Sequence, residues 1–336
     1  GTARDAVADA GGMDSFFDPA VASNAIGVGI PNVDDLYPGS RPGQLVLVAG
    51  RTSMGKSAWL LQWAWNAAQA ERTVWYYSLE MTRQDLIHRL CAHGADIDLG
   101  RIVTGRLDHP ERQRIASLLE GDAQGRIQIA DTQSVTTATM GVHLARAKAK
   151  PDLVIVDYLQ LLRINPRANR YEQVSEISRS LKCLAVEHGV PIIAGSQLSR
   201  PETGKDDAAP RLSDLRDSGS LEQDADVVCF LHGKQADKLH PLRDVEYLVA
   251  KHRQGRLGKV ALTFEGAKQR FFDPTGHTDP AGGAHPWRCL TARAKELGVE
   301  VQGPSGTRQN ARIWSRDRGR GNFSTRPHGV IPRKSL

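Results

Sequence analysis

Short apolar runs recur through the middle of the chain, and most of them are continuous rather than alternating with polar residues. Continuous runs of about four to eight residues are typical of strands that are covered on both faces. The pattern predicts strands at residues 45–49, 74–79, 127–130, 153–157, 190–196, 226–231, 245–250 and 259–264.

Stretches with helical periodicity separate the early strands. They are predicted at residues 57–70, 83–91, 108–120 and 171–188. Alternation of strands and helices is typical of a parallel sheet, whereas the last strands follow one another after short gaps. The sequence therefore predicts an α/β fold with a mainly parallel central sheet, flanking helices and antiparallel strands at one edge.

The two ends of the chain lack this regular pattern. Residues 1–26 have weak periodicity and a glycine pair, which indicates a linker or a frayed helix. Residues 274–286 are rich in glycine and proline, and the segment beyond them has too few apolar residues to fold alone. We predict a partly disordered linker at 1–26, a folded domain at 27–275 and a mostly disordered basic tail at 276–336.

Composition narrows the class of protein. The chain has 336 residues, of which 40% are apolar and 24% are charged, as in an ordinary globular protein. No apolar run approaches the roughly 18 residues of a membrane span, and no secretory signal is recognisable. The four cysteines are far apart and form no CxxC pair, which argues against a zinc site or a disulfide framework. We expect no membrane partner and a cytoplasmic, nucleoid-associated location.

The net charge of +6 is unevenly distributed. Residues 277–336 hold 11 Lys and Arg against four acids, so the tail carries +7 and the rest of the chain carries −1. The folded domain is thus near neutral. The Arg-Gly-rich tail is either a nonspecific nucleic-acid contact or a solvated extension.

A glycine-rich phosphate loop, GRTSMGKS at residues 50–57, follows the first predicted strand and precedes a predicted helix. Its glycines let backbone N–H groups curl around phosphate oxygens at a helix N-terminus. In this motif the lysine reaches the β- and γ-phosphates, and the last hydroxyl binds Mg²⁺. We expect ATP and Mg²⁺, with nucleotide contacts from Gly50, Ser53, Met54, Gly55, Lys56 and Ser57.

Three further polar residues end predicted strands, and the carboxyl ends of parallel strands meet at one edge. Asp157 ends LVIVD and is the candidate metal carboxylate, unless it merely terminates the strand. Glu80 ends VWYYSLE and is the candidate general base, or alternatively the cap of helix 83–91. Gln197 ends VPIIAGSQ, where it either senses the γ-phosphate or is a satisfied polar residue in a turn.

Taken together, these segments resemble the C-terminal motor domain of DnaB-type replicative helicases. The resemblance runs from about Gly29 to Phe272. It rests on the strings GIPNVDDLYPGSRPGQLVLVAGRTSMGKS, YYSLEM, LVIVDYLQLL, GSQLSR, PRLSDLRDSGSLEQDADVV and VAKHRQG. It implies a RecA-like P-loop ATPase fold, with residues 27–275 as the helicase motor domain.

The resemblance also implies roles for individual residues. It supports Glu80, Lys56 and Gln197 as catalytic residues, and it makes Lys251 and Arg253 a basic pair that reaches the nucleotide of a neighbouring subunit. From the residues alone, a solvated surface charge is the simpler interpretation of Arg253. The resemblance places Arg216, Asp217 and Gly219 in a loop that lines the central channel and contacts DNA, although the same residues also suit a helix-capping turn before Ser220.

At the level of function, the resemblance implies an ATP-dependent 5′–3′ DNA helicase of replication that encircles single-stranded DNA as a homo-hexamer. A helicase loader or primase is a further implied partner. The sequence departs from the family pattern at Thr52, Ser57 and Asp217, where proline, threonine and glutamate are usual. The family's N-terminal, primase-interacting domain has no counterpart in these residues, so the sequence supports hexamer assembly less directly than ATP binding.

Two other functions fit the same motifs. One is a RecA-like ATPase that binds single-stranded DNA, or a truncated accessory subunit, without unwinding duplex. The other is a signalling or protein-remodelling ATPase of the same fold. DNA would stimulate ATP hydrolysis by the first kind of protein and would leave the rate of hydrolysis by the second unchanged.

Overall fold

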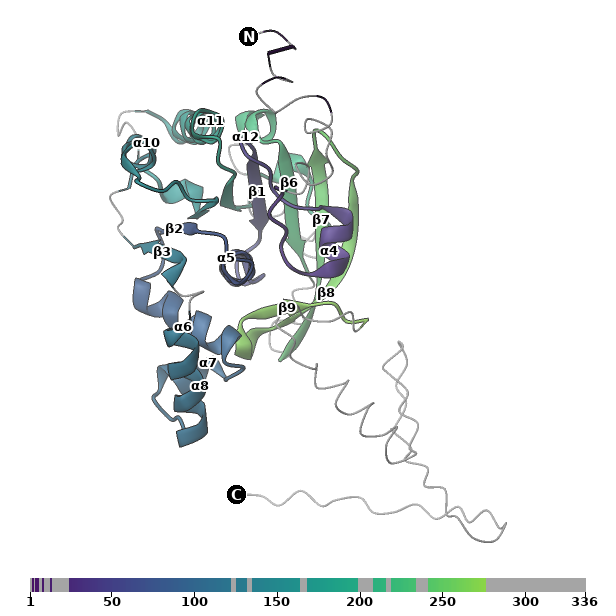
Figure 1. Ribbon diagram of the computed structural model, residues 1–336. Helices are drawn as coiled ribbons and strands as arrows, with labels where there is room; N and C mark the ends of the chain where they lie inside the picture. The colour runs from purple at the N-terminus through teal and green to yellow at the C-terminus, as the bar shows by residue number, and fades with distance from the viewer. Residues whose placement is uncertain are drawn as a thin grey trace. The chain divides into compact units, whose positions relative to one another are not determined.

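The structure is a computed structural model, shown in Figure 1. It describes residues 24–121, 125–131, 135–163, 168–198, 208–215, 219–233 and 241–275, together with residues 2, 4, 5, 8 and 13. The chain divides into two units, Gly1–Gly282 and Gly283–Leu336, and all described residues belong to the first. The predicted tail and most of the predicted linker lie outside the described residues, so the predicted domain boundaries stay predictions.

The described residues form one nine-stranded sheet with the order β3-β2-β4-β5-β1-β6-β7-β8-β9. The six strands from β3 to β6 in this order are parallel, and β7, β8 and β9 are antiparallel. The predicted architecture is thereby confirmed. The strands are β1 Leu45–Gly50, β2 Val74–Ser78, β3 Ile127–Ala130, β4 Leu153–Asp157, β5 Ile192–Gln197, β6 Val227–His232, β7 Leu242–His252, β8 Gly258–Glu265 and β9 Arg270–Phe272.

The helices include all four that periodicity predicts and several that it misses. They are α4 Pro31–Leu36, α5 Lys56–Gln69, α6 Arg83–Gly94, α7 Leu99–Val103, α8 His109–Glu120, α10 Thr137–Arg146, α11 Arg170–His188 and α12 Gly219–Asp224, with 3₁₀ turns η1 Leu159–Leu161, η2 Leu212–Asp214 and η4 Gly266–Lys268. The helices α4, α7 and α12 are too short to show a period. Helix α10 is missed because its threonines and glycine are weak helix formers, and a capping box at Thr136 starts it.

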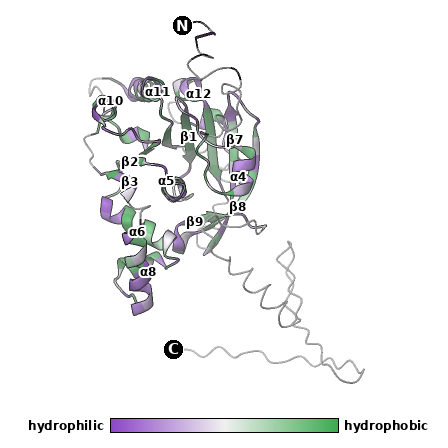
Figure 2. Ribbon diagram, viewed as in Figure 1, coloured by the Kyte–Doolittle hydropathy of each residue, from purple (hydrophilic) through white to green (hydrophobic). Residues whose placement is uncertain are grey.

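Helices cover both faces of the central strands, which explains why the apolar runs are continuous. In β1, Val46 and Val48 pack in a core that includes α5, whereas Leu45, Leu47 and Ala49 pack in a core that includes residues of α10 and α11. Figure 2 shows the hydrophobic colouring of these central strands. A third, smaller cluster lies under α6, α7 and α8. No helix in the described part of the chain is long and apolar enough to span a membrane.

Helix α5 joins the parallel and antiparallel parts of the sheet. The Trp59 ring stacks on Tyr247 of β7 at a centroid distance of 4.8 Å and meets Phe271 of β9 edge-on at 5.2 Å. The Gln62 side chain donates to the Phe271 carbonyl at 2.9 Å and accepts from its N–H at 2.7 Å. Because β9 is only three residues long and depends on these contacts, the sequence pattern does not reveal it.

Replacing Trp59 with Ala tests this packing. The indole is fully buried, so we expect Trp59→Ala to lower the free energy of unfolding by about 3–5 kcal/mol. Denaturant unfolding measures the loss. As a control, Val186→Ala alters a side chain that is 60% exposed and is expected to change stability by less than about 0.5 kcal/mol. Equal effects of the two substitutions would contradict this account of the core.

Candidate active site at the carboxyl edge of the sheet

The phosphate loop, residues 50–57, connects the end of β1 to the start of α5. Ser53 and Gly55 have φ angles of 69° and 85°, in the left-handed region, which makes the turn tight. A Cβ atom on Gly55 would lie 2.7 Å from the Phe271 ring, so glycine is needed for space as well as for conformation. No side chain caps the N-terminus of this 14-residue helix. Its first N–H groups and its dipole are therefore directed at the loop, as anion binding requires.

The remaining predicted loop residues shape this turn. Gly50 is the last residue of β1, and a Cβ there would lie 3.2 Å from the Leu231 carbonyl oxygen. Met54 is buried in the core and its N–H donates to the Arg51 carbonyl at 3.3 Å. The Ser53 carbonyl accepts a 2.7 Å hydrogen bond from Arg243 of β7. The loop is thus anchored by its side chains and by the antiparallel strands.

Lys56 extends its ammonium group toward the end of β5. Its Nζ donates to the Ser196 carbonyl at 3.2 Å and lies 4.9 Å from the centre of the Tyr158 ring. Burial lowers the pKa of Lys56, and the nearby carboxylates of Asp157 and Glu80 oppose that shift. A partly dehydrated ammonium gains from an anionic ligand, which a phosphate would supply.

Asp157 ends β4 and is 1% exposed. The Tyr76 hydroxyl donates to its Oδ2 at 3.0 Å, while its Oδ1 is buried without a hydrogen-bond partner among the described residues. Burial raises the pKa of Asp157, against the opposing effects of a hydrogen bond from Ser57, the charge of Lys56 and the Tyr76 hydroxyl. A buried carboxylate oxygen without a partner beside the Ser57 hydroxyl fits the environment of a divalent cation.

A metal site built from many protein ligands is not seen in the described residues. Within the ranges that the structure describes, no three His, Cys, Asp or Glu residues gather as metal ligands would. Mg²⁺ usually takes one or two protein ligands and completes its shell with phosphates and water. Ser57 and Asp157 are the residues that fit this requirement.

Glu80 lies two residues beyond β2 and is exposed. Because Ser78 of β2 pairs with Asp157 of β4, Glu80 emerges at the same edge as the phosphate loop. The alternative role as a helix cap is wrong. Thr82 caps α6 instead, accepting a 3.2 Å hydrogen bond from the N–H of Asp85, whose carboxylate completes a capping box.

Gln197 is the last residue of β5 and pairs with Gly50 of β1. Its side-chain Nε2 donates to the Thr52 hydroxyl at 3.3 Å. The structure therefore brings together six of the predicted site residues at one edge of the sheet: Gly50, Lys56, Ser57, Glu80, Asp157 and Gln197. Thr52 and Tyr76 also belong to this edge, and their participation follows from contacts between strands that are far apart in the sequence.

Lys251 and Arg253 lie away from this edge. In the sheet, Gly50 is level with Leu231 and Tyr247, and β7 then runs antiparallel toward the start of β6. Arg253 follows Tyr247 by six residues, which at about 3.3 Å per residue places it roughly 20 Å from the level of Gly50. The structure does not bring this basic pair to the chain's own phosphate loop.

Both basic side chains are held in place where they lie. Lys251 Nζ donates to the carbonyl oxygens of Glu222 and, at 2.7 Å, Ala225, and burial lowers its pKa. Arg253 pairs with Asp226 at 3.3 Å. Asp226 is itself buried, and it accepts hydrogen bonds from the Leu45 N–H at 2.8 Å and from Lys182 at 2.6 Å. Arg253 is therefore anchored beside the start of the central strands.

Arg216 and Asp217, the predicted DNA contacts, lie outside the described residues. Gly219 begins α12, and a Cβ there would lie 3.2 Å from the Tyr171 hydroxyl of α11. Ser220 and Ser175 join the two helices by a hydrogen bond of 2.6 Å between their hydroxyl oxygens. The start of α12 is thus fixed against α11.

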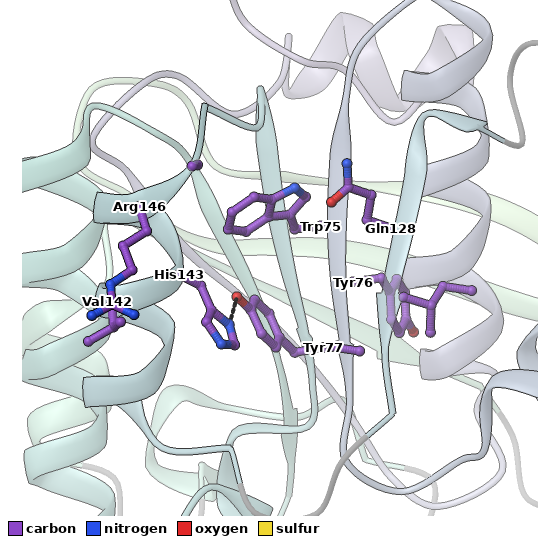
Figure 3. Close-up of a pocket in the computed structure, with 10 residues that line it drawn as sticks. Trp75, Tyr76, Tyr77, Gln128, Val142, His143 and Arg146 are labelled. Carbon is purple, nitrogen blue, oxygen red and sulfur yellow. Dashed lines mark hydrogen bonds between the residues drawn. The ribbon is translucent and has the colours of Figure 1, made fainter. Parts of the chain in front are cut away.

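A separate hollow of about 490 Å³ lies between β2, β3 and α10 (Figure 3). Trp75, Tyr77 and Arg146 are among its lining residues, and the Tyr77 hydroxyl is 3.3 Å from Nδ1 of His143. None of the predicted site residues lines it. The candidate active site is therefore the open edge around the phosphate loop rather than this hollow.

Replacing Asp157 with Asn tests the cost of burying its charge. Because burial raises the pKa of Asp157 in the folded state, the free energy of unfolding falls as pH rises from the ordinary pKa of an aspartate through the raised one. We expect Asp157→Asn to raise Tm at about pH 7.5, with a smaller gain near pH 4. The same substitution should weaken Mg²⁺-dependent nucleotide binding about 10- to 100-fold.

Thermal unfolding at the two pH values and titration with a fluorescent nucleotide measure these effects. Asp244→Asn is the control, because Asp244 is exposed on β7, and it should leave both quantities unchanged. A lower Tm for Asp157→Asn at neutral pH would show that the carboxylate stabilises the fold.

Comparison with known proteins agrees with the fold. A solved DnaB-like replicative helicase, described together with its interactions with primase, superposes with a TM-score of 0.67 at 34% identity, covering 74% of this chain and 63% of that one. A second solved structure, of a separate ATPase domain, superposes with a TM-score of 0.70 at 32% identity, covering 81% and 99%. A KaiC-like protein from Pyrococcus horikoshii, at 20% identity and a TM-score of 0.50, shares the fold.

Sequence relatives agree with the structural ones. The replicative DNA helicase DnaB of Leifsonia xyli is 39% identical over 251 residues, which are 73% of this chain and 55% of that protein. The corresponding protein of Geobacillus stearothermophilus is 38% identical over 250 residues, or 71% and 54%. The chain thus spans about half the length of these relatives. The sequence model of the DnaB-like helicase C-terminal domain matches residues 25–273, and the chain belongs to this family.

Proposed function

We propose that this chain is the ATP-hydrolysing motor of a replicative DNA helicase, which translocates 5′ to 3′ on single-stranded DNA as a homo-hexameric ring. The observation that carries the proposal is the separation of the phosphate loop from Lys251 and Arg253. The phosphate loop lies at the carboxyl ends of the parallel strands, and Lys251 and Arg253 lie near the amino ends of the same strands. A nucleotide site that uses both therefore requires two copies of the chain. A ring of identical head-to-tail interfaces supplies such a site at every junction.

At the phosphate loop, the proposed roles follow from the contacts of each side chain. Lys56 and the N–H groups at the start of α5 would bind the phosphates, and Ser57 and Asp157, whose Oδ1 has no partner among the described residues, would hold Mg²⁺. Bound Mg²⁺ supplies neutralisation of the phosphate charge. Glu80 orients the attacking water and accepts its proton, and Gln197, held by Thr52, contacts the γ-phosphate.

Lys251 and Arg253 complete the site of the neighbouring copy. The charge that develops on the transferred phosphate is stabilised by an arginine, an effect worth about 10³- to 10⁵-fold in rate in other nucleotide hydrolases. The bond to Asp226 holds the Arg253 guanidinium at the start of the central strands. Because this arginine would act on the nucleotide of the neighbouring copy, any change in the contact between two copies would alter the rate of ATP hydrolysis.

The proposed DNA contacts are Arg216, Asp217 and Gly219, in the segment that leads into α12. Because the chain before the basic tail carries a net charge of −1, a few placed groups rather than a basic surface would hold the phosphates. Single-stranded DNA and further copies of the chain are the proposed partners. Primase is a further proposed partner because a structural relative is described with primase, and a helicase loader is proposed from the family resemblance alone.

Measurement of ATP hydrolysis with and without single-stranded DNA tests the proposal, together with unwinding of forked duplexes that carry a 5′ or a 3′ tail. We expect DNA to stimulate hydrolysis and only the 5′-tailed fork to be unwound. Lys56→Ala should abolish both activities because it removes the phosphate-binding ammonium. Lys148→Ala removes an exposed lysine and serves as the control.

Two outcomes would contradict the proposal. Stimulated hydrolysis without unwinding, at concentrations that permit assembly, would indicate an ATPase that binds single-stranded DNA. Hydrolysis that is indifferent to DNA would indicate a signalling or remodelling ATPase of the same fold.

A further inference from the structure

The end of β5 extends beyond its partner β4. The pairing of β4 with β5 ends at Val156 and Ala194, whereas β5 stays paired with β1 as far as Gln197. On the side that β4 leaves open, the last two residues of β5 meet the side chain of Gln160 from η1. A side chain thus replaces a strand at this point.

Gln160 is 4% exposed and makes three hydrogen bonds to the end of β5. Its Nε2 donates to the Ser196 hydroxyl at 2.9 Å and to the Gln197 carbonyl at 3.3 Å. Its Oε1 accepts from the Gln197 N–H at 3.2 Å. The amide therefore holds the Gln197 backbone from both its N–H and its carbonyl.

The two residues that Gln160 holds are the same two that contact the phosphate loop. The Ser196 carbonyl accepts the hydrogen bond from Lys56, and the Gln197 side chain donates to Thr52. A shift of Gln160 would therefore change the position of both the lysine and the amide that face the phosphates.

Gln160 is connected in turn to α11. Its backbone carbonyl accepts a 2.8 Å hydrogen bond from Arg170, the first residue of that helix. The first two turns of α11 meet the start of α12, where Tyr171 lies beside Gly219 and Ser175 bonds to Ser220. The contacts thus run without a break from Gly219, the described residue of the proposed DNA-binding segment, to the phosphate loop.

We propose that Gln160, anchored by Arg170, is a positioning residue that sets Gln197 and the Ser196 carbonyl against the phosphate loop and links them to the proposed DNA-binding segment. This inference rests on the proposed function, because it concerns how DNA stimulates ATP hydrolysis. A buried amide with both its donor and its acceptor engaged moves together with its partners, since leaving any of these groups unpaired is costly.

Arg170 offers the cleaner test because it is exposed, so its replacement leaves the core intact. We expect Arg170→Met to reduce the ratio of DNA-stimulated to basal hydrolysis about 2- to 30-fold, the range that coupling residues typically show. The KM for ATP should stay within about twofold, because nothing that binds the nucleotide is removed. Arg179→Met, an exposed arginine on the same helix, is the control and should keep the wild-type ratio.

Gln160→Met keeps the length of the side chain and removes its hydrogen bonds. We expect it to lower kcat with and without DNA, and to change the KM for ATP less than kcat because Lys56 itself is retained. Because both residues act through one contact, the double variant should be no worse than Gln160→Met alone. Circular dichroism and Tm identify any variant that fails to fold, in which case Arg170→Met decides the question.

A stimulation ratio for Arg170→Met equal to that of Arg179→Met and wild type would overturn the link to the DNA segment. A wild-type kcat in Gln160→Met would overturn its positioning role. If the wild-type chain itself is not stimulated by DNA, the proposed function fails, and the kcat of Gln160→Met still decides whether Gln160 positions the site.

Discussion

The direction of the strands is the constraint on which the rest of the structure depends. Six parallel strands deliver their carboxyl ends, and with them the phosphate loop, Asp157 and Gln197, to one edge. Strand β7 runs in the opposite direction and carries Lys251 and Arg253 to the amino ends of the parallel strands. A sheet built in this way cannot close its own nucleotide site with those two residues, so the arrangement suits a protein whose activity depends on contact between copies.

Within the edge that carries the phosphate loop, burial of opposite charges without full compensation prepares the site for its ligands. Burial lowers the pKa of Lys56 and raises that of Asp157, although each charge favours the other. Phosphate and a divalent cation would supply the charges that these groups lack. Burying these two charges destabilises the folded state. The loop nevertheless keeps its place because strands pair with β1 on both sides and the aromatic residues of α5 pack against β7 and β9.

Much of this site could be predicted because it obeys a local rule. Residues that follow an apolar run in a parallel sheet gather at one edge, so Glu80, Asp157 and Gln197 were predictable from sequence. Their partners were not, because the contacts of Gln160 and Tyr76 depend on strand order and on how far β5 extends beyond β4. Similarly, the three residues of β9 hold their place through Gln62 and Trp59 rather than through a pattern of their own.

The most direct test of a site shared between copies is ATP hydrolysis by mixtures of two inactive variants, Glu80→Gln and Arg253→Ala. In a mixed ring, about a quarter of the interfaces join an intact phosphate-loop edge to an intact Arg253, so activity should return and peak near equal mixing. A mixture of Glu80→Gln with Lys56→Ala is the control, because both lesions lie at the same edge and no interface is restored. Absence of recovery at every ratio would contradict the account.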